Sequence, residues 1–452
     1  MSLTTLPAEI LLLILDCIDL PETLRNFCLL SARFRAIAQP LLYREITLAP
    51  EDLSLSLLLL CRTITTCPLI ASQVRSLDID TEQPIDLDET ERPERRGLSK
   101  HDTRFLKCEA QKLNIGSIEL FDSVSWATDS IILSLLLISR SPNLRELFIN
   151  LDPAGLSLLT SLAQARTADN LSCFRDLHGN GIDIRNITLL LSFLHLSKIQ
   201  ISHYDSTCGL DETDACNPVQ TAPDVPLGSL SVSAISLHRS SINTSDMGTL
   251  VNSCKELDSL YYGQCNSQAI HLNPEQLHSQ LLFQRDSLRV LQLSYEDDSL
   301  GTGPSPAFTP PHFGSLLGLD HLESLTIDQI YLNAAPEFPP SLTRLSIQNC
   351  QTPIGGLMIY LANLASTGRF PNLKNVFLHS DDIYPGRMLD LPRRGATDVL
   401  FHEACRGLLG IFNGTNVTLR LNKDLLRGTV RGYADAFEFG LPGVYWPFVY
   451  ML

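Results

Sequence analysis

The stretch Leu288-Arg289-Val290-Leu291-Gln292-Leu293 carries the pattern that decides the fold of this chain. Its first, fourth and sixth residues are apolar. Side chains alternate along a strand, so Leu291 and Leu293 fall on one face and Gln292 on the other. The stretch therefore predicts a short strand that buries one face and exposes the opposite one.

This apolar-x-x-apolar-x-apolar pattern recurs along most of the chain. Ten copies occur, at 74–79, 115–120, 144–149, 196–201, 232–237, 257–262, 288–293, 322–327, 342–347 and 373–378. Helical periodicity precedes many of them, at 129–139, 154–168, 186–196, 245–254, 274–283 and 354–365. Asn273-Pro274-Glu275 marks one helix start, since Asn is a favoured cap and Pro is tolerated in the first turn.

Helix, turn and short strand at irregular spacing resemble a degenerate leucine-rich repeat. The resemblance implies an α/β fold in which stacked units form a parallel sheet inside and helices outside. Cys265 and Cys350 occupy the Asn/Cys position of that family, where a small inward side chain is expected. A generic βαβ fold is the alternative, because Leu-x-x-Leu-x-Leu arises easily in a leucine-rich chain.

The expected repeat domain covers residues 49–426, and polar stretches interrupt it. These are rich in charge, Gly or Pro and are interpreted as loop inserts near 81–104, 205–226, 296–313 and 381–397. The apolar, aromatic end at 427–452 is expected to pack as a C-terminal cap.

Residues 1–48 have a different pattern, that of a small helical module. Three helices are expected, at 7–18, 21–30 and 31–38, with Pro7 in the first turn and Thr5 as a candidate cap. Every residue from Ile10 to Leu15 is apolar, so the first helix must be covered on more than one side. Either a partner or the rest of the chain could cover it.

The order and spacing of this segment resemble an F-box, and with the repeats the chain resembles the fungal-type F-box family. Tyr43 departs from the pattern, because many members carry Trp there. The resemblance implies binding to the Skp adaptor, and through it to cullin, by Leu6, Pro7, Glu9, Ile10, Ile14, Leu24, Leu29 and Phe34.

The implied function is that of a substrate-recognition adaptor of a Skp-cullin-F-box ubiquitin ligase. A non-ligase scaffold that uses the same module is the alternative. The protein substrate is expected to meet the exposed sheet positions, where Phe148 and Tyr261 are large aromatic candidates. The acidic insert at 205–226 ranks second. In the competing interpretation, the two aromatic residues only cover the sheet surface.

Composition argues against several other functions. The net charge of -16, from 34 basic and 50 acidic residues, disfavours nucleic acid and anionic membranes as partners. The 12 cysteines show no Cys-x-x-Cys pair, and together with the absence of a signal-peptide pattern they favour the cytoplasm or nucleus. Neither catalytic nor phosphate-binding nor metal-binding motifs occur, so a non-catalytic protein without cofactors is expected.

Overall fold

The computed structural model describes residues 3–18, 20–48, 53–79, 100–112, 126–150, 159, 173–180, 193, 195–202, 225–240, 242–265, 273–296, 312–350, 354–379 and 410–421. The fold is α/β, with a parallel sheet whose twelve strands follow the order of the chain from β1 to β12. The chain divides into two compact units, Met1–Ser202 and His203–Leu452.

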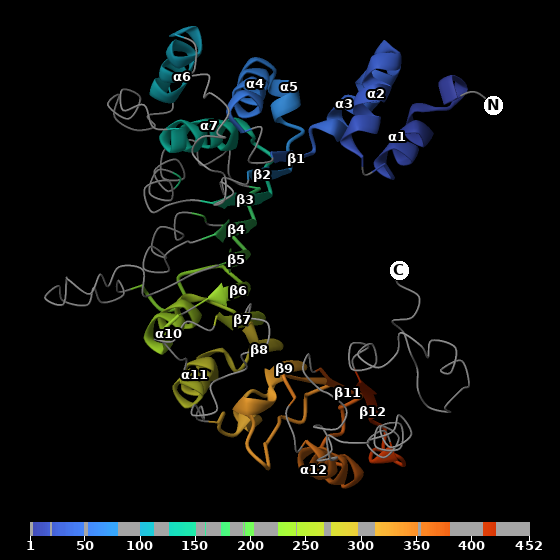
Figure 1. The fold of residues 1–452 in the computed structure, drawn as a ribbon, viewed down its shortest axis with the longest axis vertical. Coiled ribbons are helices and arrows are strands. Elements are labelled where there is room, and N and C mark those ends of the chain that lie inside the picture. Colours follow the sequence, from blue (N-terminus) through green and yellow to red (C-terminus); the bar gives the residue numbers. More distant parts are fainter. Residues whose placement is uncertain are drawn as a thin grey trace, which may run out of the picture. The chain divides into compact units, whose positions relative to one another are not determined.

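The first unit begins with helices and continues into strands β1 to β5 (Figure 1). Its helices are α1 (Ala8–Asp16), α2 (Pro21–Leu30), α3 (Ala32–Leu42), α4 (Leu53–Thr66), α5 (Pro68–Ala71), α6 (Lys100–Lys112) and α7 (Trp126–Arg140). Its strands are β1 (Glu45–Leu48), β2 (Ser76–Ile79), β3 (Glu146–Asn150), β4 (Asp176–Asn180) and β5 (Lys198–Ser202).

The second unit contains strands β6 to β12, with helices between some of them. The strands are β6 (Ala234–Ser240), β7 (Ser259–Cys265), β8 (Val290–Glu296), β9 (Ser324–Asp328), β10 (Arg344–Gln348), β11 (Asn375–Leu378) and β12 (Thr418–Leu421). The helices are α10 (Thr244–Ser253), α11 (Pro274–Leu281) and α12 (Gly355–Ser366), with short 3₁₀ turns at Leu282–Gln284, Leu316–Gly318 and Gln329–Tyr331.

The register of the strands aligns the repeated motif from one strand to the next. In the first unit, Leu77 pairs with Leu147, Leu147 with Leu177, and Leu177 with Ile199. In the second unit the aligned and buried residues are Ile235, Leu260, Leu291, Leu325, Leu345, Val376 and Leu419. The motif therefore builds a continuous apolar layer under each part of the sheet.

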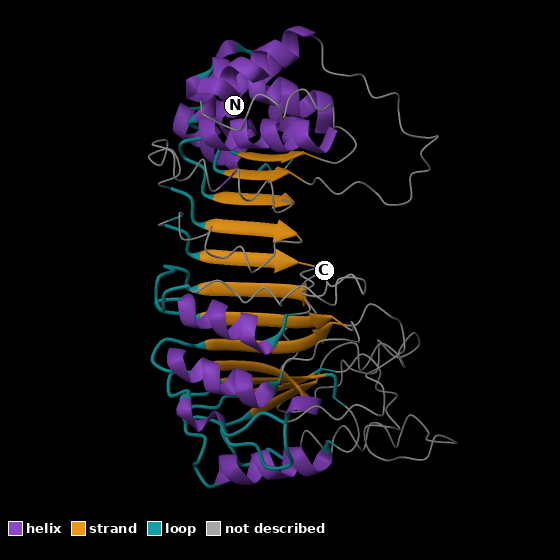
Figure 2. Cartoon of the chain, turned by 90° about the vertical axis from the view of Figure 1, so that its left-hand side faces the viewer, coloured by secondary structure: helices purple, strands orange, loops and turns teal. Residues whose placement is uncertain are grey.

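Within each unit, helices cover one side of the strands (Figures 1 and 2). In the first unit α4 packs against α7, and the thiol of Cys61 donates to the carbonyl oxygen of Leu133 at 3.1 Å. In the second unit α10 packs against α11. Asn273 caps α11 as predicted, because its side chain accepts from the backbone nitrogens of Glu275 and Gln276.

Helices α1, α2 and α3, called the N-terminal module here, enclose a small core of their own. Its buried residues are Leu15, Leu24, Cys28 and Ala38. Ser31 caps α3 by accepting from the nitrogen of Phe34, and Arg35 Nε donates to the carbonyl oxygen of Cys28 at the end of α2. Helices α2 and α3 are therefore linked by hydrogen bonds at the corner where they meet.

Some predicted boundaries are wrong. Helix α3 continues past Ala38 and through Pro40 to Leu42, since Leu41 and Leu42 pack on the core of the module. Thr5 does not cap α1, because it lies in a 3₁₀ turn at Leu3–Thr5 and Pro7 occupies the cap position.

Other differences concern the inserts and the strand count. Helix α6 begins at Lys100, within the stretch at 81–104 that was interpreted as a loop, and β1 places the first strand inside residues 1–48. The apolar pattern did not predict strand β4, because Gly179 occupies the position of the third apolar residue. Strand β12 also lies outside the ten copies.

Several expected elements fall outside the described residues. They are the copy at 115–120, nearly all of the helices expected at 154–168 and 186–196, most of the inserts at 81–104, 205–226 and 296–313, the insert at 381–397, and the C-terminal cap at 427–452.

Candidate docking surface

Helix α1 buries little of its apolar surface. Only Leu11 and Leu15, one helical turn apart, are buried, each at 1% exposure. Four apolar residues of the helix are exposed, at 40–64%: Ile10, Leu12, Leu13 and Ile14. These four residues are called the docking surface here. With 3.6 residues per turn they cover most of the helix circumference that faces away from Leu11 and Leu15.

A shallow groove of about 300 Å³ borders the docking surface. Helix α1 contributes Ala8, Glu9 and Leu12 to it, and α3 contributes Ala36, Ile37 and Pro40. The walls are mainly apolar, and Glu9, in the first turn of α1, is the single charged residue in the lining. The arrangement suits an apolar side chain of a partner beside a hydrogen-bond donor or a cation for Glu9.

The segment before α1 is held against α3. Arg33 of α3 donates hydrogen bonds to the carbonyl oxygens of Thr4 and Leu6. Leu6 is half-buried and Pro7 is exposed at the cap position, with φ -54° and ψ 152°. These contacts fix the chain where it enters the helix, so Leu6 and Pro7 have a defined position at one end of the docking surface.

The residues predicted to bind a partner divide into two groups. Pro7, Glu9, Ile10, Ile14 and Leu29 are exposed and Leu6 is half-buried, so a partner can reach them. Leu24 and Phe34 are buried at 7% and 4%. These two side chains therefore lie in the interior of the module rather than on its surface.

Sequence reasoning missed part of the exposed apolar surface. Leu12 and Leu13 are the most exposed large apolar residues of α1, and Leu20 and Leu30 are each 67% exposed at the two ends of α2. Helical periodicity could have identified Leu13, because it lies opposite Leu11 and Leu15 on the helix. Leu30 carries no such signal, since it depends on how the chain turns into α3.

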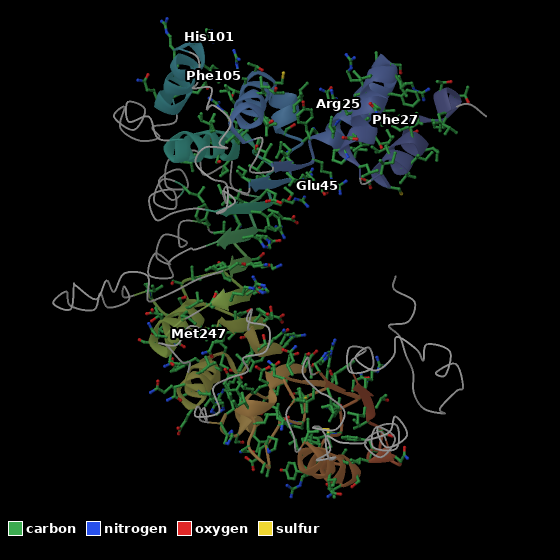
Figure 3. The ribbon with its side chains drawn as sticks, viewed as in Figure 1. Arg25, Phe27, Glu45, His101, Phe105 and Met247 are labelled. Carbon is green, nitrogen blue, oxygen red and sulfur yellow. The ribbon has the colours of Figure 1, made fainter. Side chains whose placement is uncertain are left out.

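The N-terminal module joins the sheet through α3 and β1. Arg44 Nη1 pairs with Asp16 Oδ1 at 2.7 Å and thereby ties the start of β1 to the end of α1. In Figure 3, Arg25 and Phe27 mark α2, and Glu45 marks the first residue of β1. The module is therefore attached at one end of the strand order.

The two predicted substrate residues lie on the strand face opposite the buried leucines. Phe148 on β3 is half-buried and stacks on His178 of β4, with ring centroids 3.9 Å apart and planes at 15°. Tyr261 on β7 is also half-buried, with its ring 4.3 Å from that of His238. They belong to different compact units, so each forms its own aromatic pair.

Cys350 confirms the expectation of a small, inward side chain at its position in the repeat. Cys350 is buried and its thiol donates to the carbonyl oxygen of Ile347 at 3.3 Å. Burial raises the pKa of this thiol to about 12, so it stays protonated and packs as a small apolar group. The side chain of Cys265 lies outside the described residues.

The described parts of the chain lack two further features. They contain no group of three or more His, Cys, Asp or Glu side chains arranged to hold a metal ion. None of their helices has the length and apolar character needed to cross a membrane.

Comparison of the whole sequence with known proteins gave no match, either to a protein-family model or to a curated protein.

Proposed function

We propose that this chain is a substrate-recognition adaptor of a Skp-cullin-F-box ubiquitin ligase. The N-terminal module is the F-box, which binds the Skp adaptor, and the sheet is a leucine-rich-repeat scaffold that holds a protein for ubiquitination. The observation that carries the proposal is the docking surface of α1, whose four apolar residues are exposed although α2 and α3 pack on the same helix.

Exposure of this apolar surface favours a partner on energetic grounds. Burying apolar area stabilises a complex by about 25 cal/mol per Å². A contiguous exposed apolar patch on a small module is typical of a protein-interaction site. The module has a core of a few residues, and docking would add the contacts that so small a domain lacks.

The proposed role needs no bond chemistry from the chain itself. Holding a substrate beside a charged conjugating enzyme raises its effective concentration at the reacting centre. The module and the sheet then have separate tasks, assembly and capture.

The first experiment tests assembly with Leu13→Glu, because Leu13 is 64% exposed and supports no core contact. Tagged wild-type and variant chains are precipitated from lysate and probed for the Skp adaptor. We expect wild type to recover the Skp adaptor and Leu13→Glu to recover at least about tenfold less of it, because a charge buried in the interface would oppose docking.

Leu69→Glu is the matched control. Leu69 on α5 is also apolar and 84% exposed, so the substitution changes charge and surface in the same way outside the docking surface. The proposal is wrong if wild type recovers no Skp adaptor, or if the two variants behave alike.

The same precipitates distinguish a ligase adaptor from a non-ligase scaffold. A ligase adaptor recovers cullin together with the Skp adaptor, and a scaffold recovers the Skp adaptor alone. Cullin bound by wild type and lost with Leu13→Glu would support the ligase.

A double change at the start of α1 tests the edge of the surface. Leu6→Ala with Pro7→Ala removes a half-buried apolar contact and the residue at the cap position of α1. We expect weaker binding of the Skp adaptor, by about 2 kcal/mol for each anchor that is buried in the interface. If the double variant bound the Skp adaptor with unchanged affinity, Leu6 and Pro7 would lie outside the interface.

Capture is tested on the sheet with Phe148→Ala and Tyr261→Ala. Proximity labelling with the proteasome blocked identifies proteins held by wild type, and an assembly-deficient Leu6→Ala/Pro7→Ala chain should hold the same set. If neither aromatic substitution alters that set, substrate recognition lies elsewhere on the chain.

A further inference from the structure

The last three strands, with the residues next to them in sequence, carry basic side chains and no acidic ones. No Asp or Glu occurs from Phe338 to Ser380, nor in β12 and the residues just before it, 410–421. Within these ranges Arg344 begins β10, Lys374 precedes β11 and Arg420 lies in β12. The whole chain has a net charge of -16, so the positive charge of these two ranges is opposite in sign to that of the chain.

Two of these cations share one aromatic ring. Phe377 of β11 pairs in register with Arg420 of β12, on the strand face opposite the buried Val376 and Leu378. The guanidinium carbon of Arg344 lies 4.6 Å from the centroid of the Phe377 ring, and that of Arg420 lies 5.4 Å from it. Phe377 is 9% exposed, although it lies on the face of the sheet opposite the buried apolar layer, which is called the outer face here.

Stacking fixes the two guanidinium groups without using their hydrogen-bond donors. An aromatic ring attracts the flat face of a guanidinium group, so the N–H groups at its edge remain available. Within the described part of the chain, no ion pair or side-chain hydrogen bond involves Arg344, Lys374 or Arg420. Arg420 Nε is buried there and lacks a hydrogen-bond partner, so the terminal N–H groups of this side chain are the ones that a ligand could meet.

The acidic residues of the neighbouring strand are already engaged. Glu323, just before β9, lies 3.6 Å from Arg289, on the side away from β10. Asp328, at the end of β9, is buried and accepts from Asn349 Nδ2 at 3.0 Å. Within the described residues, neither carboxylate forms an ion pair with Arg344, Lys374 or Arg420.

We propose that the outer face of β10, β11 and β12 binds an acidic, extended peptide segment of a partner protein, with Arg344 and Arg420 as the anchoring residues. Carboxylates match the fork of an arginine side chain and form charge-assisted hydrogen bonds with it. That this partner is the protein presented for ubiquitination rests on the proposed function. The binding of the acidic segment does not.

The geometry indicates the spacing of the acidic side chains. The two guanidinium carbons are 4.6 and 5.4 Å from one ring centroid, so they lie within about 10 Å of each other. An extended chain spans that distance in roughly three residues. Two acidic residues separated by one or two others therefore fit the pair of guanidinium groups.

The experiment measures fluorescence anisotropy of a labelled peptide of ten residues, alternating Glu and Ser, mixed with the purified full-length chain. A peptide in which Gln replaces Glu is the neutral probe. We expect the acidic peptide to bind, the neutral one not to, and binding to weaken as salt is raised. Arg344→Ala with Arg420→Ala should weaken it at least about tenfold.

Two further variants distinguish binding at the stacked arginines from a general effect of positive charge. Lys255→Ala with Arg285→Ala removes the same charge at exposed turns that precede β7 and β8, and should leave affinity unchanged. Phe377→Leu keeps the charge but removes the ring that holds both guanidinium groups, and should weaken binding by about threefold. Circular dichroism checks that each variant is folded.

Some results would overturn the inference. The site is wrong if Arg344→Ala with Arg420→Ala binds as tightly as wild type, or if the Lys255/Arg285 control loses as much affinity. Equal binding of the neutral peptide would overturn the acidic specificity. Leu13→Glu should bind the peptide like wild type, so failure of Skp assembly and failure of this site give different results.

Discussion

The N-terminal module and the sheet use the same apolar residue types in opposite ways. In the sheet, motif leucines such as Leu147, Leu291 and Leu345 are fully buried, and the exposed positions between them are mostly polar. In α1, Leu12 and Leu13 are 45% and 64% exposed. Leucine content alone therefore indicates neither stability nor binding. What matters is whether a neighbouring element of the same chain covers the side chain.

The difference follows from how each region can be covered. Each strand of the sheet has a neighbour in register, so the apolar layer continues from one motif to the next. The module has three helices and no such repetition, and its core contacts use only one face of α1. Sheet leucines thus support folding, while α1 leucines are available for association.

The largest expected effect compares one leucine from each region. Leu345→Ala should lower the free energy of unfolding by about 2–5 kcal/mol, because it leaves a cavity in a fully buried layer. Leu13→Ala should lower it by less than about 0.5 kcal/mol, since Leu13 is exposed. Urea-induced unfolding followed by circular dichroism measures both. Similar losses for the two variants would contradict the comparison.

A smaller effect is expected from a buried polar link in the sheet region. Gln284 accepts from the nitrogen of Leu257 at 3.0 Å, and its Nε2 donates to the carbonyl oxygens of Val251 and Cys254 at 3.0 and 2.9 Å. Gln284→Ala should lower the free energy of unfolding by about 1–3 kcal/mol, because it leaves these buried groups unpaired. The exposed Gln276 supplies the control, and Gln276→Ala should be close to neutral.

The response to pH should also differ between the two regions. Burial lowers the pKa of His278, on α11, below 6.5. The unfolded chain then binds the proton more readily than the folded one, so stability falls as pH drops through 6.5 and levels off below the folded pKa. His278→Gln should reduce that loss between pH 7 and 5. Residues 1–48 contain no histidine.

Hydrogen exchange at pH 7 and pH 5 can follow this difference region by region. Amides of α11 should lose more protection in wild type than in His278→Gln. After correction for the intrinsic exchange rate, amides of α2 and α3 should respond equally in both proteins. An unchanged pH response of α11 in the variant would exclude His278 as its source.

The smallest effect concerns the ion pair that links the module to the sheet. Arg44 and Asp16 are about half exposed, so their coupling energy should be at most about 0.5 kcal/mol. A double-mutant cycle with Arg44→Ala and Asp16→Ala measures it, and high salt should abolish it. Arg25→Ala on α2 is a matched exposed control. A coupling above about 1 kcal/mol would show a firmer attachment than the exposure indicates.

Much of the fold was predictable from local patterns. Strict spacing of apolar residues located nine of the twelve strands, cap residues located the start of α11, and the expected bounds of α2 were correct. The misses have identifiable causes. Gly179 breaks the motif in β4, and packing of Leu41 and Leu42 extends α3 beyond the expected end at Ala38.

The candidate sites were predictable only in part. Apolar residues from Ile10 to Leu15 indicated that α1 meets more than its own module, but not which residues are exposed. The sequence indicated Phe148 and Tyr261 as outer-face aromatics, but gave no sign of their pairing with His178 and His238. Those pairs depend on the register between strands, which tertiary packing sets.

The sequence by itself determined the order of elements, because strand alternation, helix periodicity and turn chemistry are local properties of the chain. Only the tertiary structure decided that Arg344 and Arg420, far apart in sequence, share the ring of Phe377. Parallel strands bring residues tens of positions apart to neighbouring places on one face. Charge and aromatic contacts across strands therefore come from register, which local patterns do not encode.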